Sequence, residues 1–281
     1  MKVFNHINSL RAWLKNKKRL GKTIGFVPTM GALHCAHGSL IQRSQKRCDI
    51  TVVSIFVNPL QFGPQEDFNE YPRMMNADLQ FLKKEKVDIV FTPSYAEMYP
   101  NGFSTLIHIS GPIVHGLCAP FRPNHFNGVA TVVLKLLHIV HPTHLFLGQK
   151  DAQQVAVIKK ILQDLNWNTQ VVVCPTLREA DGLALSSRNK RLSASSRKFA
   201  SKLFESLHCG KKCAQSGEKN VLTVLNLIRD KIRQEPRIHI QYLEVVHKDT
   251  LQPLQKIQPQ KTMIAIAATI DNVRLIDNII V

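Results

Sequence analysis

Two histidines, His34 and His37, lie three residues apart in the segment Pro28–His37. This segment follows an apolar run and leads into residues 39–41, which are typical of the opening of a helix. Residues three apart on a first helical turn face the same way, beside free backbone N–H groups and the positive end of the helix dipole. The spacing therefore predicts a phosphate site. Zinc is disfavoured because it needs a third ligand, and the nearest acidic residue along the chain is Asp49, past the predicted helix.

Other polar residues follow predicted strands or open predicted helices. Lys150 and Asp151 close a strand and begin a helix, where a lysine can reach phosphate, although the pair by itself is better explained as an exposed helix start with a good cap. Gln61 and Gln154 carry amides that both donate and accept hydrogen bonds, but such residues are also common on surfaces and in turns. Residues 185–189 form a polar loop with two hydroxyls and a cation, which is common in solvated loops. These residues gain meaning only in combination.

Apolar periodicity in the first part of the chain alternates between short strand-like runs and longer helical ones. One helix is expected over Asn127–Val140, which carries a single apolar stripe, and another over Asp151–Leu165. The expected strands are Thr23–Val27, Ile50–Val57, Asp88–Phe91, His144–Leu147 and Thr169–Cys174, with a short edge strand at Ser104–Ile109. This pattern predicts an α/β fold with a doubly wound, Rossmann-like parallel sheet, whose ligands collect at the carboxyl ends of the strands.

The pattern changes after Pro175. Two helical stretches, Ser193–Cys209 and Glu218–Gln234, precede alternating runs at Ile238–Val246, Met263–Thr269 and Val273–Asn278. A helix pair followed by a small antiparallel sheet predicts a smaller α+β domain. We therefore expect two domains, residues 1–175 and 176–281, with residues 176–190 as a polar loop at the start of the second.

Composition excludes several classes of protein. The chain has 281 residues, of which 44% are hydrophobic and 20% charged, so most of it is not disordered. Its apolar runs stop near half the length of a membrane span, and its six scattered cysteines are expected to be reduced thiols. The net charge of +17 is spread evenly, with 19 basic and 10 acidic residues in 1–175 and 18 and 10 in 176–281. An even distribution without an arginine-rich run argues against nucleic-acid binding as the main role.

The signature at His34–His37 resembles the H-x-G-H motif of the nucleotidyltransferase superfamily, and Leu185–Asn189 resembles that superfamily's mobile phosphate-holding loop. From Gly25 to the C-terminus the chain is similar to one family, the pantoate–β-alanine ligases. The resemblance is carried by VPTMGALH, VSIFVNPLQF, EDFNEYPR, RPNHFNGVATVV, GQKDAQQ, READGLALSSRN and RLIDN. It implies a cytoplasmic, homodimeric ligase that uses ATP with Mg²⁺, forms a pantoyl-adenylate and lets β-alanine displace AMP. Because the strongest motif lies near the start of the chain, we expect the N-terminus to be retained.

The resemblance also assigns residues. It implies that His37 and His34 are catalytic, with His37 as proton donor to the leaving pyrophosphate. It places pantoate on Gln61 and Gln154, with Gln61 also contacting β-alanine and Asn58 assisting. It implies no protein metal site. The residues that it assigns to ATP are Met30, Gly31, Ala32, Leu33, His34, Cys35, Ala36, His37, Gly148, Gln149, Lys150, Asp151, Leu177, Leu185, Ser186, Ser187 and Arg188.

Three positions depart from the family pattern. Ala36 replaces the glycine before the second histidine, and Gln149 replaces a glutamate. The segment Leu117–Phe126 has lost a carboxylate and two glycines and has gained Pro120, which is expected to stiffen it. Two other functions stay open. Nucleotidyl transfer would release no free AMP, and a non-catalytic RNA-binding protein would bind polynucleotides in a salt-dependent way without turning over ATP.

Overall fold

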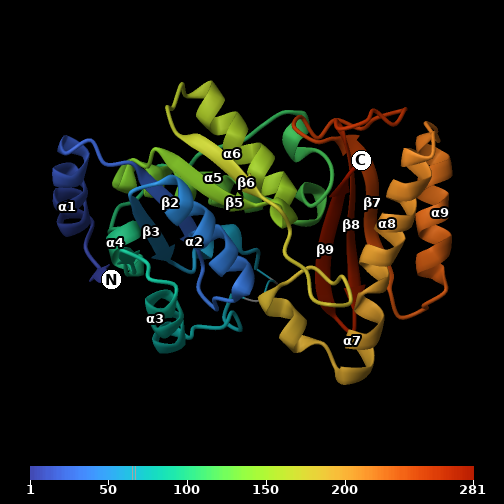
Figure 1. The fold of residues 1–281 in the computed structure, drawn as a ribbon, viewed down its shortest axis with the longest axis horizontal. Coiled ribbons are helices and arrows are strands. Elements are labelled where there is room, and N and C mark those ends of the chain that lie inside the picture. Colours follow the sequence, from blue (N-terminus) through green and yellow to red (C-terminus); the bar gives the residue numbers. More distant parts are fainter. Residues whose placement is uncertain (65, 67) are drawn as a thin grey trace. The chain divides into compact units, whose positions relative to one another are not determined.

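The computed structural model describes residues 1–64, 66 and 68–281, and its contacts divide them into two compact units (Figure 1). Unit 1 comprises Met1–Ile109, Arg122–Gly148 and Val157–Cys174. Unit 2 comprises Ser110–Phe121, Gln149–Ala156 and Pro175–Val281. Two short internal segments thus group with the C-terminal part of the chain. The division into domains 1–175 and 176–281 stays a prediction.

Unit 1 contains a six-stranded parallel sheet in the order β1-β4-β3-β2-β5-β6. Its strands are β1 (Lys2–Phe4), β2 (Ile24–Thr29), β3 (Ile50–Ile55), β4 (Ile89–Phe91), β5 (His144–Gly148) and β6 (Gln170–Cys174). The chain winds outward from β2 in both directions, so the strand order reverses between β2 and β5. Every residue of β3 is buried, as expected for a strand covered on both faces. The doubly wound fold predicted from the sequence is confirmed.

Helices cover this sheet because their apolar faces pack against the central strands. Ile41 of α2 and Leu82 of α3 share a core with Val27, Val53 and Phe146 of the strands. Helix α5 is buried around most of its circumference, which is more than the single stripe predicted. The helices of the chain up to residue 174 are α1 (Ile7–Arg19), α2 (Cys35–Arg47), α3 (Met75–Lys84), α4 (Tyr95–Met98), α5 (His125–Val140) and α6 (Ala152–Asp164).

The predicted edge strand at Ser104–Ile109 is wrong. The backbone N–H of Ile107 donates to Thr131 Oγ1 at 3.0 Å, and that of Ile109 donates to Asn127 Oδ1 at 2.9 Å. Side chains of α5 thus take hydrogen bonds that a neighbouring strand would otherwise take, and β1, which the sequence analysis did not find, forms the edge beside β4. Helices α1, α3 and α4 were also missed.

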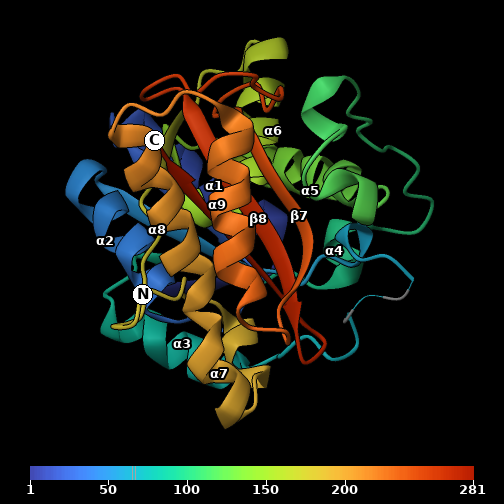
Figure 2. The same ribbon diagram turned by 90° about the vertical axis from the view of Figure 1, so that its right-hand side faces the viewer.

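Unit 2 has a three-stranded antiparallel sheet, ordered β7-β8-β9, against which α8 and α9 lie side by side (Figure 2). All residues of β8 except Thr269 are buried. The expected helix pair followed by an antiparallel sheet is confirmed, although the first helix is broken at Ser201 into two segments. The elements are α7 (Ala194–Ala200), α8 (Lys202–Gln215), α9 (Val221–Arg233), β7 (His239–His247), β8 (Thr262–Ile270) and β9 (Val273–Ile280).

Candidate active site

The histidine pair lies at the start of α2, directly after the carboxyl end of β2. His34 is the N-cap residue and His37 lies in the first turn, with the two ring centroids 4.2 Å apart. The backbone N–H of His34 donates to Nδ1 of His37 at 3.2 Å. Because a backbone N–H can only donate, Nδ1 of His37 must carry no proton, and the neutral ring then carries its proton on Nε2. The local fold therefore selects the tautomer in which Nε2 of His37 is a hydrogen-bond donor.

The backbone N–H groups between β2 and α2 already donate hydrogen bonds within the protein. The N–H groups of Ala32 and Leu33 donate to the carboxylate of Asp78, at 2.9 and 2.7 Å. The N–H of Gly31 donates to Thr29 Oγ1 at 3.3 Å. The N–H groups of residues 31–34, which precede the first turn of α2, are therefore already engaged. The assignment of Met30 through Ala36 to ATP stays a prediction. Cys35 is exposed and Ala36 is half-buried.

Asn58 and Gln61 follow β3, the strand next to β2. The Gln61 amide donates to Met30 Sδ at 2.6 Å, so the structure brings together one residue predicted for pantoate and one predicted for ATP. Asn58 is only 1% exposed. Its side chain accepts from Tyr99 Oη at 2.7 Å and donates to the Gly128 carbonyl at 3.1 Å and to Gln61 Oε1 at 3.3 Å. This geometry supports a role for Asn58 in holding Gln61.

The turn that carries Gln61, η1 (Pro59–Gln61), packs closely on α5. A Cβ atom at Gly128 would lie 2.0 Å from the Leu60 carbonyl oxygen, so only glycine allows this approach. Arg122 and His125 fasten the same turn. The Gln61 carbonyl oxygen lies 2.7 Å from His125 Nδ1 and accepts a hydrogen bond from Arg122 at 3.4 Å. The Arg122 guanidinium also binds both carboxylate oxygens of Glu66, at 2.7 and 2.5 Å.

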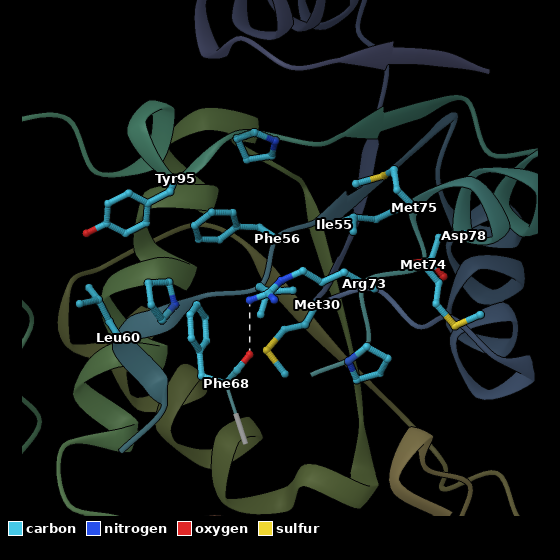
Figure 3. Close-up of a pocket in the computed structure, with 15 residues that line it drawn as sticks. Met30, Ile55, Phe56, Leu60, Phe68, Arg73, Met74, Met75, Asp78 and Tyr95 are labelled. Carbon is cyan, nitrogen blue, oxygen red and sulfur yellow. Dashed lines mark hydrogen bonds between the residues drawn. The ribbon is translucent and has the colours of Figure 1, made fainter. Parts of the chain in front are cut away.

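A cavity of about 590 Å³ opens beside Met30 and the carboxyl end of β3 (Figure 3). Its lining is mostly apolar, with one guanidinium from Arg73 and one carboxylate from Asp78. Arg73 donates to the Phe68 carbonyl at 3.3 Å and lies over the Phe68 ring. Other lining side chains include Ile55, Phe56, Leu60, Met74, Met75 and Tyr95. The sequence analysis gave Arg73 no role, although it ends the block EDFNEYPR, and did not identify Asp78.

Gly148 ends β5, which pairs with β2 in parallel register. The carboxyl ends of these two strands therefore lie at the same edge of the sheet, at the point where the strand order reverses. Ligands bind at this position in open α/β sheets. The sequence placed Met30 and Gly148 at strand ends, and the structure shows that the strands are neighbours.

In unit 2, the turn η4 (Gln149–Asp151) is held by Asn278 of β9. The Asn278 amide donates to the carbonyl oxygens of Gln149 and Lys150, both at 3.0 Å. The Gln149 side chain donates in return to Asn278 Oδ1 at 3.0 Å. A glutamate at position 149 could not make this last bond, so the departure from the family pattern has a structural partner here. Lys150 Nζ lies 3.6 Å from Asp151 Oδ1.

The residue before Asn278 holds the polar loop. Asp277 accepts two hydrogen bonds from the Arg178 guanidinium, at 2.6 and 2.9 Å, and Arg178 also lies over the Phe204 ring. Leu177 and Leu185 close the loop through a backbone hydrogen bond of 3.0 Å. Neighbouring residues 277 and 278 thus fix the two segments of unit 2 that were assigned to ATP.

Of the loop residues predicted to hold phosphate, Ser187 and Arg188 lie in the 3-10 turn η5 (Ser187–Arg191). Ser186 caps this turn, with its hydroxyl accepting from the Arg188 N–H at 3.2 Å. Asn189 donates to Glu179 Oε1 at 2.9 Å, which ties the turn back to the start of the loop. Arg197 pairs with Glu179 and Asp181, and its hydrogen bond lowers the pKa of the Asp181 carboxyl. The loop is therefore built around ionic contacts.

Gln154, the second amide predicted for pantoate, lies half-buried on α6 in unit 2. Its neighbour Gln153 is structural, because its amide accepts from the Cys118 N–H at 2.9 Å and donates to the carbonyls of Ile113 and Gly116. Cys118, at a departure from the family pattern, receives a hydrogen bond from Arg274 at 3.2 Å. Gln153 and Arg274 thus fasten the segment that Pro120 was expected to stiffen.

Within the described part of the chain, no three His, Cys, Asp or Glu side chains are grouped so that they could hold a metal ion. Over the same residues, every helix is too short or too polar to cross a membrane. All six cysteines are free thiols.

Comparisons with known proteins cover the whole chain. A family model described as pantoate-beta-alanine ligase matches residues 2–280. The pantothenate synthetase of Caldicellulosiruptor saccharolyticus is 48% identical over 281 residues, covering 100% of this chain and 99% of that protein. That of Carboxydothermus hydrogenoformans is 48% identical over 280 residues, with the same coverage.

Solved structures agree with these sequences. The crystal structure of pantothenate synthetase from Thermus thermophilus has a TM-score of 0.94 and 40% identity, and covers 99% of each chain. A pantoate-beta-alanine ligase from Francisella tularensis, complexed with β-γ ATP and β-alanine, has a TM-score of 0.80 and 37% identity. It covers 100% of this chain and 97% of that one.

Proposed function

We propose specific roles for the residues of this chain, which belongs to the pantoate–β-alanine ligase family. It is an ATP-dependent ligase that condenses pantoate with β-alanine. In the first step, a carboxylate oxygen of pantoate attacks the α-phosphorus of ATP, and the bond to the bridging oxygen breaks to release pyrophosphate. In the second, the β-alanine nitrogen attacks the acyl carbon, loses a proton and displaces AMP.

In this proposal, His37 is the hydrogen-bond donor that catalyses the first step. Negative charge grows on the oxygen that leaves with pyrophosphate, and a positioned donor stabilises it. The supporting observation is the hydrogen bond from the His34 N–H to His37 Nδ1, because it leaves Nε2 as the donor. We assign His34 to the same phosphates, and we assign the residues from Met30 to Ala36 to the nucleotide. In unit 1, Gln61 binds pantoate and β-alanine, with Asn58 assisting.

In unit 2, we assign Lys150 and the loop residues Ser186, Ser187 and Arg188 to the phosphates. Charge-assisted contacts from a lysine and an arginine suit pyrophosphate. Gln154 binds pantoate, and the rest of η4, with Leu177 and Leu185, contacts the nucleotide. The support is that β9 fixes both segments through Asp277 and Asn278.

We propose that Mg²⁺ arrives with ATP. Mg²⁺ keeps several waters and commonly binds through substrate phosphates with one or two carboxylates, so it needs no dedicated cluster of protein ligands. The ion neutralises phosphate charge when bound.

We also propose a cytoplasmic homodimer. The six free thiols suit a reducing compartment. An exposed surface for a second copy is offered by residues 104–109, where Leu106 is 63% exposed. We propose no nucleic-acid or membrane partner. Sedimentation of the purified protein tests the dimer, and a monomer at micromolar concentration contradicts it.

Exchange of labelled pyrophosphate into ATP tests the two-step reaction. With ATP, Mg²⁺ and pantoate alone, the enzyme should catalyse this exchange, because the adenylate forms reversibly without β-alanine. Arg188→Ala should depress the exchange, since it removes a cation assigned to pyrophosphate. Exchange that requires β-alanine would refute the separable intermediate. Equal amounts of AMP and pyrophosphate in the full reaction distinguish ligation from nucleotidyl transfer.

A further inference from the structure

The backbone before the histidine pair has a conformation that needs external support. Gly31 and Ala32 both have positive φ, at 85° and 51°. Glycine adopts this left-handed region freely, whereas a residue with a Cβ atom rarely does. A residue such as Ala32 keeps this conformation only where the surrounding structure enforces it. The next residues, Leu33 and His34, lead directly into α2, so the support for Ala32 also sets the start of the helix.

That support comes from Asp78 of α3. Its two carboxylate oxygens each take one N–H of the strained segment, from Ala32 and Leu33. The carboxylate approaches so closely that a Cβ atom at Gly31 would lie 2.9 Å from Oδ2. Asp78 is only 3% exposed and lines the same cavity as Met30, on the side of Met74 and Met75 (Figure 3). Hydrogen bonds to an ionised acceptor are stronger than neutral ones, and this carboxylate makes two.

We propose that Asp78 is a positioning residue for ATP. It acts through the backbone of Ala32 and Leu33, which sets the N-cap at His34 and the first turn that carries His37. Its carboxylate occupies N–H groups that a phosphate would otherwise take, so it directs the phosphates toward α2. The inference rests on the proposed assignment of residues 30–37 to ATP.

Kinetics of Asp78→Asn test the proposal. Asparagine keeps the shape but turns an NH₂ group toward one of the two N–H donors. The KM for ATP should rise about tenfold, the cost of roughly one hydrogen bond, while the KM for pantoate changes less than about threefold. Ala32→Gly in the same chain should recover part of this loss, because glycine adopts the positive φ without help. Unchanged kinetics for ATP in the folded variant overturn the proposal.

Asp88→Asn is the matched control. Asp88 also accepts a backbone N–H, from Thr51 at 2.8 Å, but at the amino ends of β3 and β4. It should leave the KM for ATP unchanged even if it lowers the melting temperature. An equal effect of both variants on ATP shows general destabilisation and overturns the proposal. Recovery of Asp78→Asn by excess Mg²⁺ assigns the carboxylate to the metal and also overturns it.

Two further variants keep the outcome decisive. If Asp78→Asn does not fold, Asp78→Glu keeps the charge but displaces the carboxylate by one methylene, and an unchanged KM for ATP in that variant overturns the proposal. His37→Ala separates the underlying assignment. If it leaves turnover intact, residues 30–37 do not serve ATP. If it lowers turnover while Asp78→Asn leaves the KM for ATP unchanged, only the positioning role is wrong.

Discussion

The histidine pair of unit 1 and the candidate loop segments of unit 2 are held in different ways. In unit 1, the histidine pair is fixed largely by its own neighbours, through the N-cap, the His34–His37 hydrogen bond and two positive φ angles, with Asp78 as the distant support. In unit 2, Asn278 holds the segment with Lys150, and Asp277 holds Arg178 of the loop that carries Arg188, through contacts that span 128 and 99 residues. Local support produces a contiguous motif, whereas remote support leaves the functional segment looking like an ordinary loop.

The largest expected effect is a loss of turnover in His37→Ala of unit 1, which should exceed the loss in Lys150→Ala of unit 2. His37→Ala should lower kcat about 100- to 1000-fold, or about 2.7–4 kcal/mol, because it removes a donor that acts in the transition state. Lys150→Ala should lower turnover less, since we assign phosphate binding to Lys150 and Arg188 together. Steady-state turnover at saturating ATP measures both, with His208→Ala of unit 2 as a distant control. Equal losses would break the distinction.

The ion pair Arg178–Asp277 of unit 2 should contribute more to the free energy of unfolding than the ion pair Arg122–Glu66 of unit 1. Asp277→Asn leaves the Arg178 guanidinium mostly buried without its charge partner and should destabilise the protein by about 3 kcal/mol. Glu66→Gln, which removes the corresponding partner of Arg122, should cost about half as much, because that pair is more exposed. Urea denaturation compares them. A larger loss for Glu66→Gln than for Asp277→Asn contradicts the ranking.

Alanine substitutions of Gln61 and Gln154 test whether each of these two side chains binds pantoate. Each change to alanine should raise the KM for pantoate about tenfold, roughly 1.4 kcal/mol, with the KM for ATP nearly unchanged. Gln153→Ala is the control for Gln154→Ala. The Gln153 amide donates to the carbonyls of Ile113 and Gly116, so its loss should mainly lower the stability of the protein. A variant that weakens ATP more than pantoate refutes the assignment at that position.

The smallest expected effect is the pH dependence of the stability that the Glu66–Arg122 pair contributes. Burial acts to raise the pKa of Glu66, but the hydrogen bonds and charge of Arg122 outweigh it, so the net pKa is lowered. Stability from this pair is therefore present above the unfolded value near pH 4.3 and is lost as the pH falls through the lower folded pKa. Arg122→Gln should lower stability by about 1 kcal/mol at pH 7 and by less near pH 3. Melting temperatures across that range check it, and a constant difference contradicts it.

Local patterns sufficed for strands β2, β3, β4, β5 and β6 and for α5, because buried parallel strands and an apolar helix leave strong periodic signals. They did not suffice for the edge of the sheet beside β4. Whether residues 104–109 pair as a strand depends on Thr131 and Asn127, whose side chains take the hydrogen bonds.

The candidate site shows the same division. The strand-end positions of Met30, Gln61 and Gly148 could be predicted because the carboxyl ends of parallel strands share an edge. Asp78 could not, since its contact with Ala32 spans 46 residues and depends on how α3 packs. The RLIDN block indicates only a family resemblance when read as sequence. In the fold, its Asp277 and Asn278 contact different loops.

The close approach of Gly128 to Leu60 also limits which sequences can encode this turn. The atoms that a Cβ would strike belong to the main chain, which all amino acids share, so no replacement at position 60 can create room. The placement of Gln61 therefore depends on a glycine at position 128, inside a helix where glycine is otherwise unfavourable. In a related sequence of unknown structure, a glycine four residues into the matching helix would mark the presence of this turn.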